Sequence, residues 1–286
     1  DLPYSEKRLI VTVPDDVKNA EIEAIKETNA SENEKGKNTN WVEVALPAIT
    51  AFAARRLSPY VLGVEFALGI YNGIKKLSQK EIDIVTVSNS QANKLLFPPG
   101  HPQKGCVYVG NPVDPKAYFP LAEFHRMMLE SKFTEIISIL MSLGAESIIA
   151  ERIIGMGSEM TAKCDASIPI GDAGGGNINR ECSEEKNYLF EAKLNPKNKP
   201  KMPSNLVWFP FEPTWQVISD GRIEYGLQNF TLNVTYLENY GITTDLNSAI
   251  KGNGLSVGGE FKEHQSTIWR ISGTFVDVVE DVPLSQ

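Results

Sequence analysis

Hydrophobic and polar residues alternate with two different periods along this chain. Between Pro120 and Gly144 one apolar face recurs every three to four positions, which predicts a long, core-packed helix. From Glu146 to Ile170 the period is two, with apolar residues at even numbers and polar residues at odd numbers, which predicts extended strand. Tyr188–Leu194 alternates in the same way, so we expect the two runs to pair as a hairpin.

The first half of the chain carries further helices between short strands. Strands are expected at Arg8–Val13, Glu81–Val87, Lys94–Phe97 and Gly105–Gly110. We expect helices from Asp15 or Asp16 to about Lys26, over Pro47–Leu57 and over Tyr60–Leu77. The polar, turn-rich residues 28–40 predict an exposed loop.

The last third of the chain is expected to be mostly strand. Strands are predicted at Leu206–Phe211, Thr214–Ile218 and Asn229–Tyr236 and in a long segment from Leu255 to Phe275, with a short helix at Thr244–Lys251. The pattern as a whole favours the α+β class, with helices mainly in the N-terminal half and a long twisted antiparallel sheet in the C-terminal half. We expect residues 1–286 to form a single domain, mostly helical with short strands over 1–144 and mostly antiparallel β over 145–286.

Charge and cysteine content narrow the classes of protein to consider. Lys and Arg number 28 against 36 Asp and Glu, a net charge of −8, which weighs against nucleic acid as a partner because such binding requires neutralised phosphates. Cys106, Cys164 and Cys182 are scattered and form no CxxC pair, so we expect a cytoplasmic protein rather than a disulfide-stabilised one.

Cofactor and metal motifs are incomplete in this sequence. Gly174, Gly175 and Gly176 suggest a phosphate-binding loop, but no Lys-Ser or Lys-Thr follows and the next element is a predicted strand. We interpret these glycines as a flexible hairpin loop. The three histidines have no metal-ligand spacing, and we therefore expect neither a metal nor a cofactor.

Three residues are candidates for catalysis: His101, Cys106 and His125. His101 lies in a proline-rich loop five residues before Cys106, and a Cys–His pair makes a nucleophile when the two side chains meet in space. His125 lies on the long helix and is the third candidate. The alternative is a buried strand cysteine, a turn histidine and a histidine that bonds at the helix surface.

Aromatic residues concentrate in the β-rich half. Trp208, Phe209, Phe211 and Trp215 lie within eight positions of one another and predict an apolar partner-binding patch. The alternative is a strand that is buried on both faces.

The long alternating segments have a second interpretation. Their pattern is similar to that of soluble pore-forming proteins, whose hairpins face lipid on one side and water on the other after assembly. This resemblance implies a lipid-facing set of even-numbered residues, namely Ile148, Ile154, Met156, Met160, Ile168 and Ile170. A half-buried antiparallel sheet under the long helix gives the same alternation.

Three functional hypotheses follow from the sequence. The first is a non-catalytic recognition or effector protein that uses a sheet face and a mobile loop to bind a protein partner or a second copy of itself. The second is a soluble precursor of a membrane-active, pore-forming assembly. The third is an enzyme of unrecognised type around His101, Cys106 and His125.

Overall fold

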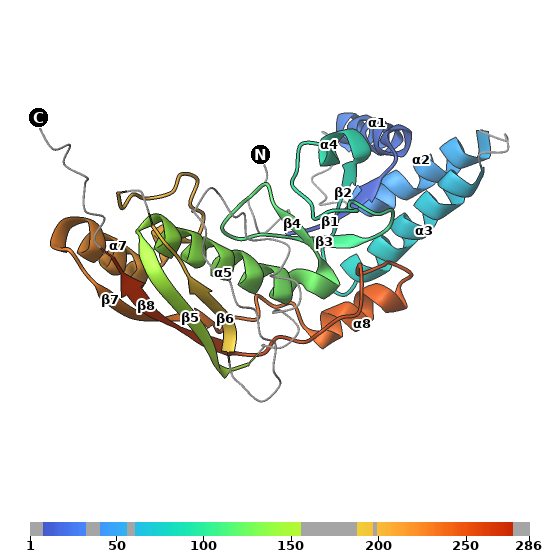
Figure 1. Ribbon diagram of the computed structural model, residues 1–286. Helices are drawn as coiled ribbons and strands as arrows, with labels where there is room; N and C mark the ends of the chain where they lie inside the picture. Colours follow the sequence, from blue (N-terminus) through green and yellow to red (C-terminus); the bar gives the residue numbers. More distant parts are fainter. Residues whose placement is uncertain (1–7, 33–40, 56–60, 156–187, 197–198, 277–286) are drawn as a thin grey trace, which may run out of the picture. The chain divides into compact units, whose positions relative to one another are not determined.

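The computed structural model describes residues 8–32, 41–55, 61–155, 188–196 and 199–276 (Figure 1). The chain divides into two compact units, one made of residues 1–125 and 241–263 and the other of residues 126–240 and 264–286. The backbone passes between the units at 125–126, 240–241 and 263–264. Whether the two units act as the single domain expected from the sequence stays a prediction.

The first unit contains a four-stranded sheet in the order β2-β1-β3-β4. Its strands are β1 (Leu9–Val13), β2 (Val85–Ser88), β3 (Val107–Gly110) and β4 (Tyr118–Pro120). β1 and β2 are parallel, whereas β3 pairs antiparallel with both β1 and β4. Every residue of β1 is buried, which accounts for its largely apolar sequence LIVTV, in which Thr12 is the one polar residue.

The first unit also contains helices. They are α1 (Asp15–Glu32), α2 (Trp41–Arg55), α3 (Val61–Ser78), α4 (Asn89–Ala92) and α8 (Thr244–Gly252). A short 3-10 helix, η1 (Leu121–Glu123), directly follows β4. α1 begins directly after Pro14, as the two aspartates predict, but it extends to Glu32. The expected loop at 28–40 is therefore wrong over 28–32, and residues 33–40 lie outside the described residues. α2 likewise starts before the expected Pro47, which lies inside the helix.

The second unit contains an antiparallel sheet in the order β6-β5-β8-β7. Its strands are β5 (Ala145–Ile154), β6 (Tyr188–Lys193), β7 (Asn229–Tyr236) and β8 (Thr267–Phe275). β5 and β6 pair as the shared period of two predicts, with Ile148 opposite Ala192. The α+β class and the antiparallel sheet of the C-terminal half are therefore confirmed.

One face of this sheet packs on the long helix α5 (Phe124–Ser142), whose residues from Arg126 onward belong to the second unit. The Phe133 ring contacts Phe190 of β6 and Trp269 of β8, with ring centroids 6.1 and 4.9 Å apart. At Gly273 a Cβ atom would lie 1.9 Å from the carbonyl oxygen of Ser147, so the close approach of β8 to β5 requires glycine there. Polar side chains such as Glu146, Lys193 and Arg270 are exposed.

Several predicted strands are absent or shorter than expected. Leu206–Phe211 and Thr214–Ile218 are not strands: the structure has a short 3-10 helix, η2 (Phe209–Phe211), and the helix α7 (Pro213–Tyr225). Pro213 stands in the first turn of α7, where its fixed φ favours a helix start. In the segment from Leu255 only Thr267–Phe275 is strand, and residue Leu96 of the predicted strand at 94–97 makes a single bridge to Ala117.

Candidate protein-binding surface

The segment that carries the aromatic residues is fixed to α5 by one carboxylate. Glu135 accepts three backbone N–H hydrogen bonds, from Val207 at 2.8 Å, from Trp208 at 2.9 Å and from Phe209 at 2.8 Å. Hydrogen bonds to an ionised acceptor are about twice as strong as neutral ones. The backbone of 207–209 therefore has one preferred position on α5.

A second buried group holds the same segment one helical turn away. The ammonium of Lys132, almost fully buried, donates to the carbonyl of Thr235 at 2.8 Å and forms an ion pair with Glu212. It also lies 5.3 Å from the centre of the Trp208 ring, in cation–π geometry. The indole N–H of Trp208 donates to Ser131 at 3.2 Å. Both ends of the 207–212 segment are thus bound to α5.

α7 continues from this segment and is anchored along its inner face. Trp215, Ile218, Ser219 and Arg222 are buried at positions i, i+3, i+4 and i+7. The Arg222 guanidinium donates to the carbonyls of Leu143, Leu227 and Val276. At the first turn the amide of Gln216 donates to the carbonyl of Phe209 at 2.9 Å, which joins α7 to η2.

The outer side of η2 and α7 is unusually apolar. Phe211 is 63% exposed, Val217 69% and Tyr225 80%, and Ile223 is also exposed; together they are four of the nine large hydrophobic side chains that are exposed in the described part of the chain. Asp220 and Glu224 are exposed on the same helical stripe as Val217, at i+3 and i+7. We call this set the 211–225 surface: Phe211, Val217, Asp220, Ile223, Glu224 and Tyr225.

The four aromatic residues predicted to bind a partner have different environments. Trp208 and Trp215 are buried, Phe209 is half-buried and Phe211 is exposed. The alternative of a strand buried on both faces is wrong, because this region is helical. Sequence reasoning missed Glu135, Lys132, Val217 and Tyr225, since only the three-dimensional pairing shows which of them support the surface and which are exposed on it.

The candidate catalytic residues His101 and Cys106 both lie near the hydroxyl of Tyr108, which the sequence did not single out. His101 Nδ1 is 2.7 Å from that hydroxyl, which also accepts the backbone N–H of Gln103 at 2.6 Å. Burial raises the pKa of Cys106 to about 11, against weaker opposing hydrogen bonds from Tyr108 and Ser256. Burial also lowers the pKa of His101, and Glu123 opposes that shift. At neutral pH this is a protonated thiol, whereas a nucleophile must be a thiolate.

His125 belongs to a different set of contacts. Its Nε2 is 2.9 Å from the carbonyl oxygen of Ile242, and its ring packs edge-on against Phe124. The side chain is almost fully buried. A hydrogen bond was the expected alternative to catalysis, but its expected place at the helix surface is wrong, because the bond is buried and joins α5 to a residue distant in sequence.

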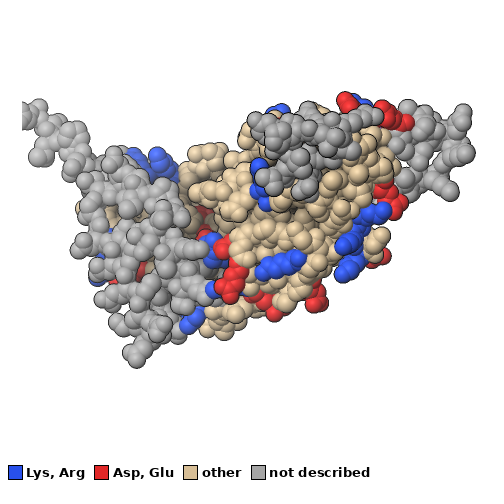
Figure 2. Space-filling view, turned by 90° about the vertical axis from the view of Figure 1, so that its right-hand side faces the viewer, with Lys and Arg blue, Asp and Glu red and all other residues tan. Residues whose placement is uncertain are grey.

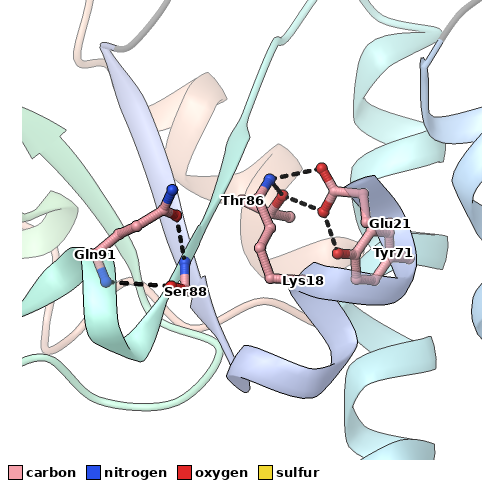
Figure 3. Close-up of polar contacts among 6 residues, drawn as sticks. All are labelled: Lys18, Glu21, Tyr71, Thr86, Ser88 and Gln91. Carbon is pink, nitrogen blue, oxygen red and sulfur yellow. Dashed lines mark hydrogen bonds and ion pairs between the residues drawn. The ribbon is translucent and has the colours of Figure 1, made fainter. Parts of the chain in front are cut away.

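A further polar cluster of the first unit lies between α1, α3 and β2 (Figure 3). The buried carboxylate of Glu21 accepts hydrogen bonds from Lys18 and Thr86, each at 2.6 Å, and from the hydroxyl of Tyr71. Burial, and then the charge of Glu21, raise the pKa of Tyr71 far above its ordinary value, so its hydroxyl remains a donor. Both carboxylate oxygens are engaged, and the cluster ties three elements together rather than offering a group to a substrate.

Figure 3 also shows the Ser88 and Gln91 pair at the start of α4. The Ser88 hydroxyl accepts the Gln91 backbone N–H at 3.1 Å, and the Gln91 side chain accepts the Ser88 N–H at 3.0 Å. This reciprocal pair is a capping box. It stabilises the helix start at the end of β2.

The proposed lipid-facing residues are only partly within the described chain. Ile148 is fully buried in the second unit, whereas Ile154 at the end of β5 is exposed. Met156, Met160, Ile168 and Ile170, and the glycines Gly174, Gly175 and Gly176, lie outside the described residues. No helix in the described ranges has the length and apolarity needed to cross a bilayer.

Neither a cluster of metal-binding side chains in the described part of the chain nor, on the face drawn in Figure 2, a surface of one charge supports the catalytic hypothesis. Among the described residues, no group of three His, Cys, Asp or Glu side chains is placed to hold a metal ion. On the face drawn in Figure 2, Lys and Arg side chains lie beside Asp and Glu side chains.

Comparison of the chain with protein-family models, with curated proteins and with solved structures finds no match.

Proposed function

We propose that this chain is a non-catalytic recognition protein that binds a protein partner through the 211–225 surface. The main observation is that an exposed aromatic residue follows a backbone segment that hydrogen bonds hold to α5. Phe211 is 63% exposed, yet the backbone on its N-terminal side is held by three N–H bonds to Glu135. An aromatic residue on a backbone that is already fixed loses less conformational entropy on binding than one on a flexible loop, which is typical of a binding hot spot.

The surface also indicates what kind of partner fits it. Its exposed charges are the carboxylates of Asp220 and Glu224, because the arginine of α7, Arg222, is buried. The complementary partner is an apolar pocket or segment with Lys or Arg at its rim. The apolar residues supply the affinity, and the acidic residues favour basic partners over acidic ones.

A peptide-display selection tests this proposal with a defined probe. The full chain is immobilised and offered a random peptide library, and enriched peptides are synthesised for fluorescence anisotropy. We expect enrichment of peptides that combine large apolar residues with Lys or Arg. Replacing a hot-spot residue costs about 2 kcal/mol or more, so Phe211→Ala is expected to weaken binding about 30-fold.

Leu237→Ala is the matched control, because Leu237 is an exposed apolar residue of the same unit outside the 211–225 surface. Its peptide affinity is expected to equal that of the wild type. Selection of no basic–apolar peptides, or equal binding by the Phe211→Ala variant, would refute the proposal.

The other two hypotheses remain predictions. A pore-forming assembly depends mainly on residues outside the described chain, and the thiol of Cys106 is buried and protonated rather than activated. We keep the cytoplasm as the proposed location, on the basis of the few, scattered cysteines.

A further inference from the structure

β7 is an edge strand of the sheet in the second unit (Figure 1), and its register with β8 is regular. Asn229 lies opposite Thr274, and the register continues without a shift to Tyr236 opposite Thr267. The N–H of Phe275 donates to the carbonyl of Gln228 at 2.7 Å. Because bonded pairs alternate in an antiparallel ladder, Phe230, Leu232 and Val234 bond to β8.

The intervening residues Asn229, Thr231, Asn233 and Thr235 therefore direct their backbone N–H and C=O groups away from β8. The bond from Lys132 to the carbonyl of Thr235 agrees with this assignment, because that carbonyl is reached from outside the ladder. Lys132 occupies the Thr235 end of the edge. The stretch from Asn229 to Asn233 has no strand beside it in the described part of the chain.

This stretch lacks the usual protection of an edge strand. Natural edges are guarded by charged side chains, proline or bulges. β7 has the sequence NFTLNVTY, with neither charge nor proline, and its pairing with β8 has no bulge. Asn229, Thr231 and Asn233 are all exposed.

We propose that β7 pairs antiparallel with β7 of a second copy of this chain about a two-fold axis at Thr231. The free stretch is centred on Thr231, so Thr231 faces its own counterpart and Asn229 faces Asn233 of the second copy. Each of these three pairs exchanges two hydrogen bonds, about six in all. The pairing joins two four-stranded sheets into one continuous sheet.

A second copy is the occupant that the edge fits best. An isologous two-fold contact requires a self-complementary surface, and a neutral strand of Asn and Thr residues meets itself without like-charge repulsion. The side chains that face each other are Thr with Thr and Asn with Asn, which can form hydrogen bonds across the strands. The contact is small, so the dimer is expected to be weak and dependent on concentration.

Sedimentation of the full chain over a range from low micromolar to several hundred micromolar tests the pairing. We expect a reversible monomer–dimer equilibrium that Thr231→Lys abolishes, because the two introduced charges would face each other at the axis. Thr231→Pro is expected to abolish it as well, since it removes an N–H that β8 does not use. Ser248→Lys, which changes an exposed residue of α8 in the first unit, is the charge-matched control and should still dimerise.

Cysteine cross-linking tests the register. In a background with Cys164 and Cys182 replaced by serine, Thr231→Cys is expected to form a disulfide-linked dimer, because bonded antiparallel partners lie about 5.5 Å apart at Cα. Asn229→Cys should cross-link far more slowly, since its partner is Asn233. A wild type that remains monomeric at the highest concentration, a dimer unaffected by Thr231→Lys, or equal cross-linking at both positions would overturn the proposal.

Discussion

At the scale of single residues, burial decides the chemistry of Cys106. The thiol is fully buried and its pKa is raised from about 9 to about 11. Between these two values the unfolded chain loses the proton while the folded chain keeps it, so the folded state binds more protons. The raised pKa of Cys106 therefore contributes about 2–3 kcal/mol to the free energy of unfolding below pH 9. This contribution is lost as the pH rises from 9 to 11.

Urea unfolding at pH 8, 9, 10 and 11 checks this prediction. The free energy of unfolding of the wild type should fall more steeply with pH than that of Cys106→Ala, although the variant is less stable at pH 8. Ellman's reagent, used on a chain with Cys164 and Cys182 replaced by serine, should label folded Cys106 slowly at pH 7. Rapid labelling at pH 7 would mean an accessible thiolate and would return the catalytic hypothesis to first place.

At the scale of secondary-structure elements, Glu135 determines the position of the 207–209 segment. Glu135→Ala leaves three backbone N–H groups without their acceptor, and we expect it to lower the free energy of unfolding by about 1.5–3 kcal/mol. Glu135→Gln keeps one oxygen acceptor and should cost less. Urea unfolding gives both values, and hydrogen exchange at Val207, Trp208 and Phe209 should accelerate most in the alanine variant. Unchanged exchange at these three amides would contradict the assigned role.

The elements that the sequence predicted well are those whose period was long and unambiguous. The apolar stripe between Pro120 and Gly144 indicated α5, and the alternation over 146–170 and 188–194 indicated the pairing of β5 with β6. Of the first run, residues 156–170 lie outside the described residues. The segment 206–218 was wrongly assigned as strand because large apolar residues on consecutive positions have no distinguishing period. Its helical start depends on Pro213 and on the capping of 207–209 by Glu135, which is distant in sequence.

The candidate site was predictable only as a region. The concentration of aromatic residues drew attention to 208–215, but burial of Trp208 and exposure of Phe211 depend on which side of η2 faces α5. Tyr108 shows the same limit: a hydroxyl that joins His101 and Cys106 belongs to a strand whose neighbours are set by tertiary contacts. Sequence spacing alone contains no signal for such contacts.

At the scale of the whole molecule, the net charge of −8 acts on the two proposed contacts in opposite directions. Two copies of the same acidic chain repel each other, whereas the acidic residues of the 211–225 surface attract a basic partner. The β7 edge itself is neutral, so repulsion between two copies comes from charges farther away and is sensitive to screening. The Debye length falls from about 10 Å at 0.1 M salt to about 3 Å at 1 M.

Raising the salt concentration should therefore strengthen the β7 dimer while it weakens binding of the selected basic peptides. Sedimentation and anisotropy in the same NaCl series measure the two dissociation constants. In the Asp220→Asn and Glu224→Gln variants the dissociation constant of the peptide should depend less on the salt concentration. The same variants should still form the dimer at the β7 edge. If both dissociation constants rose with salt, the dimer contact would depend on charge attraction, and a neutral strand pairing with itself could not explain it.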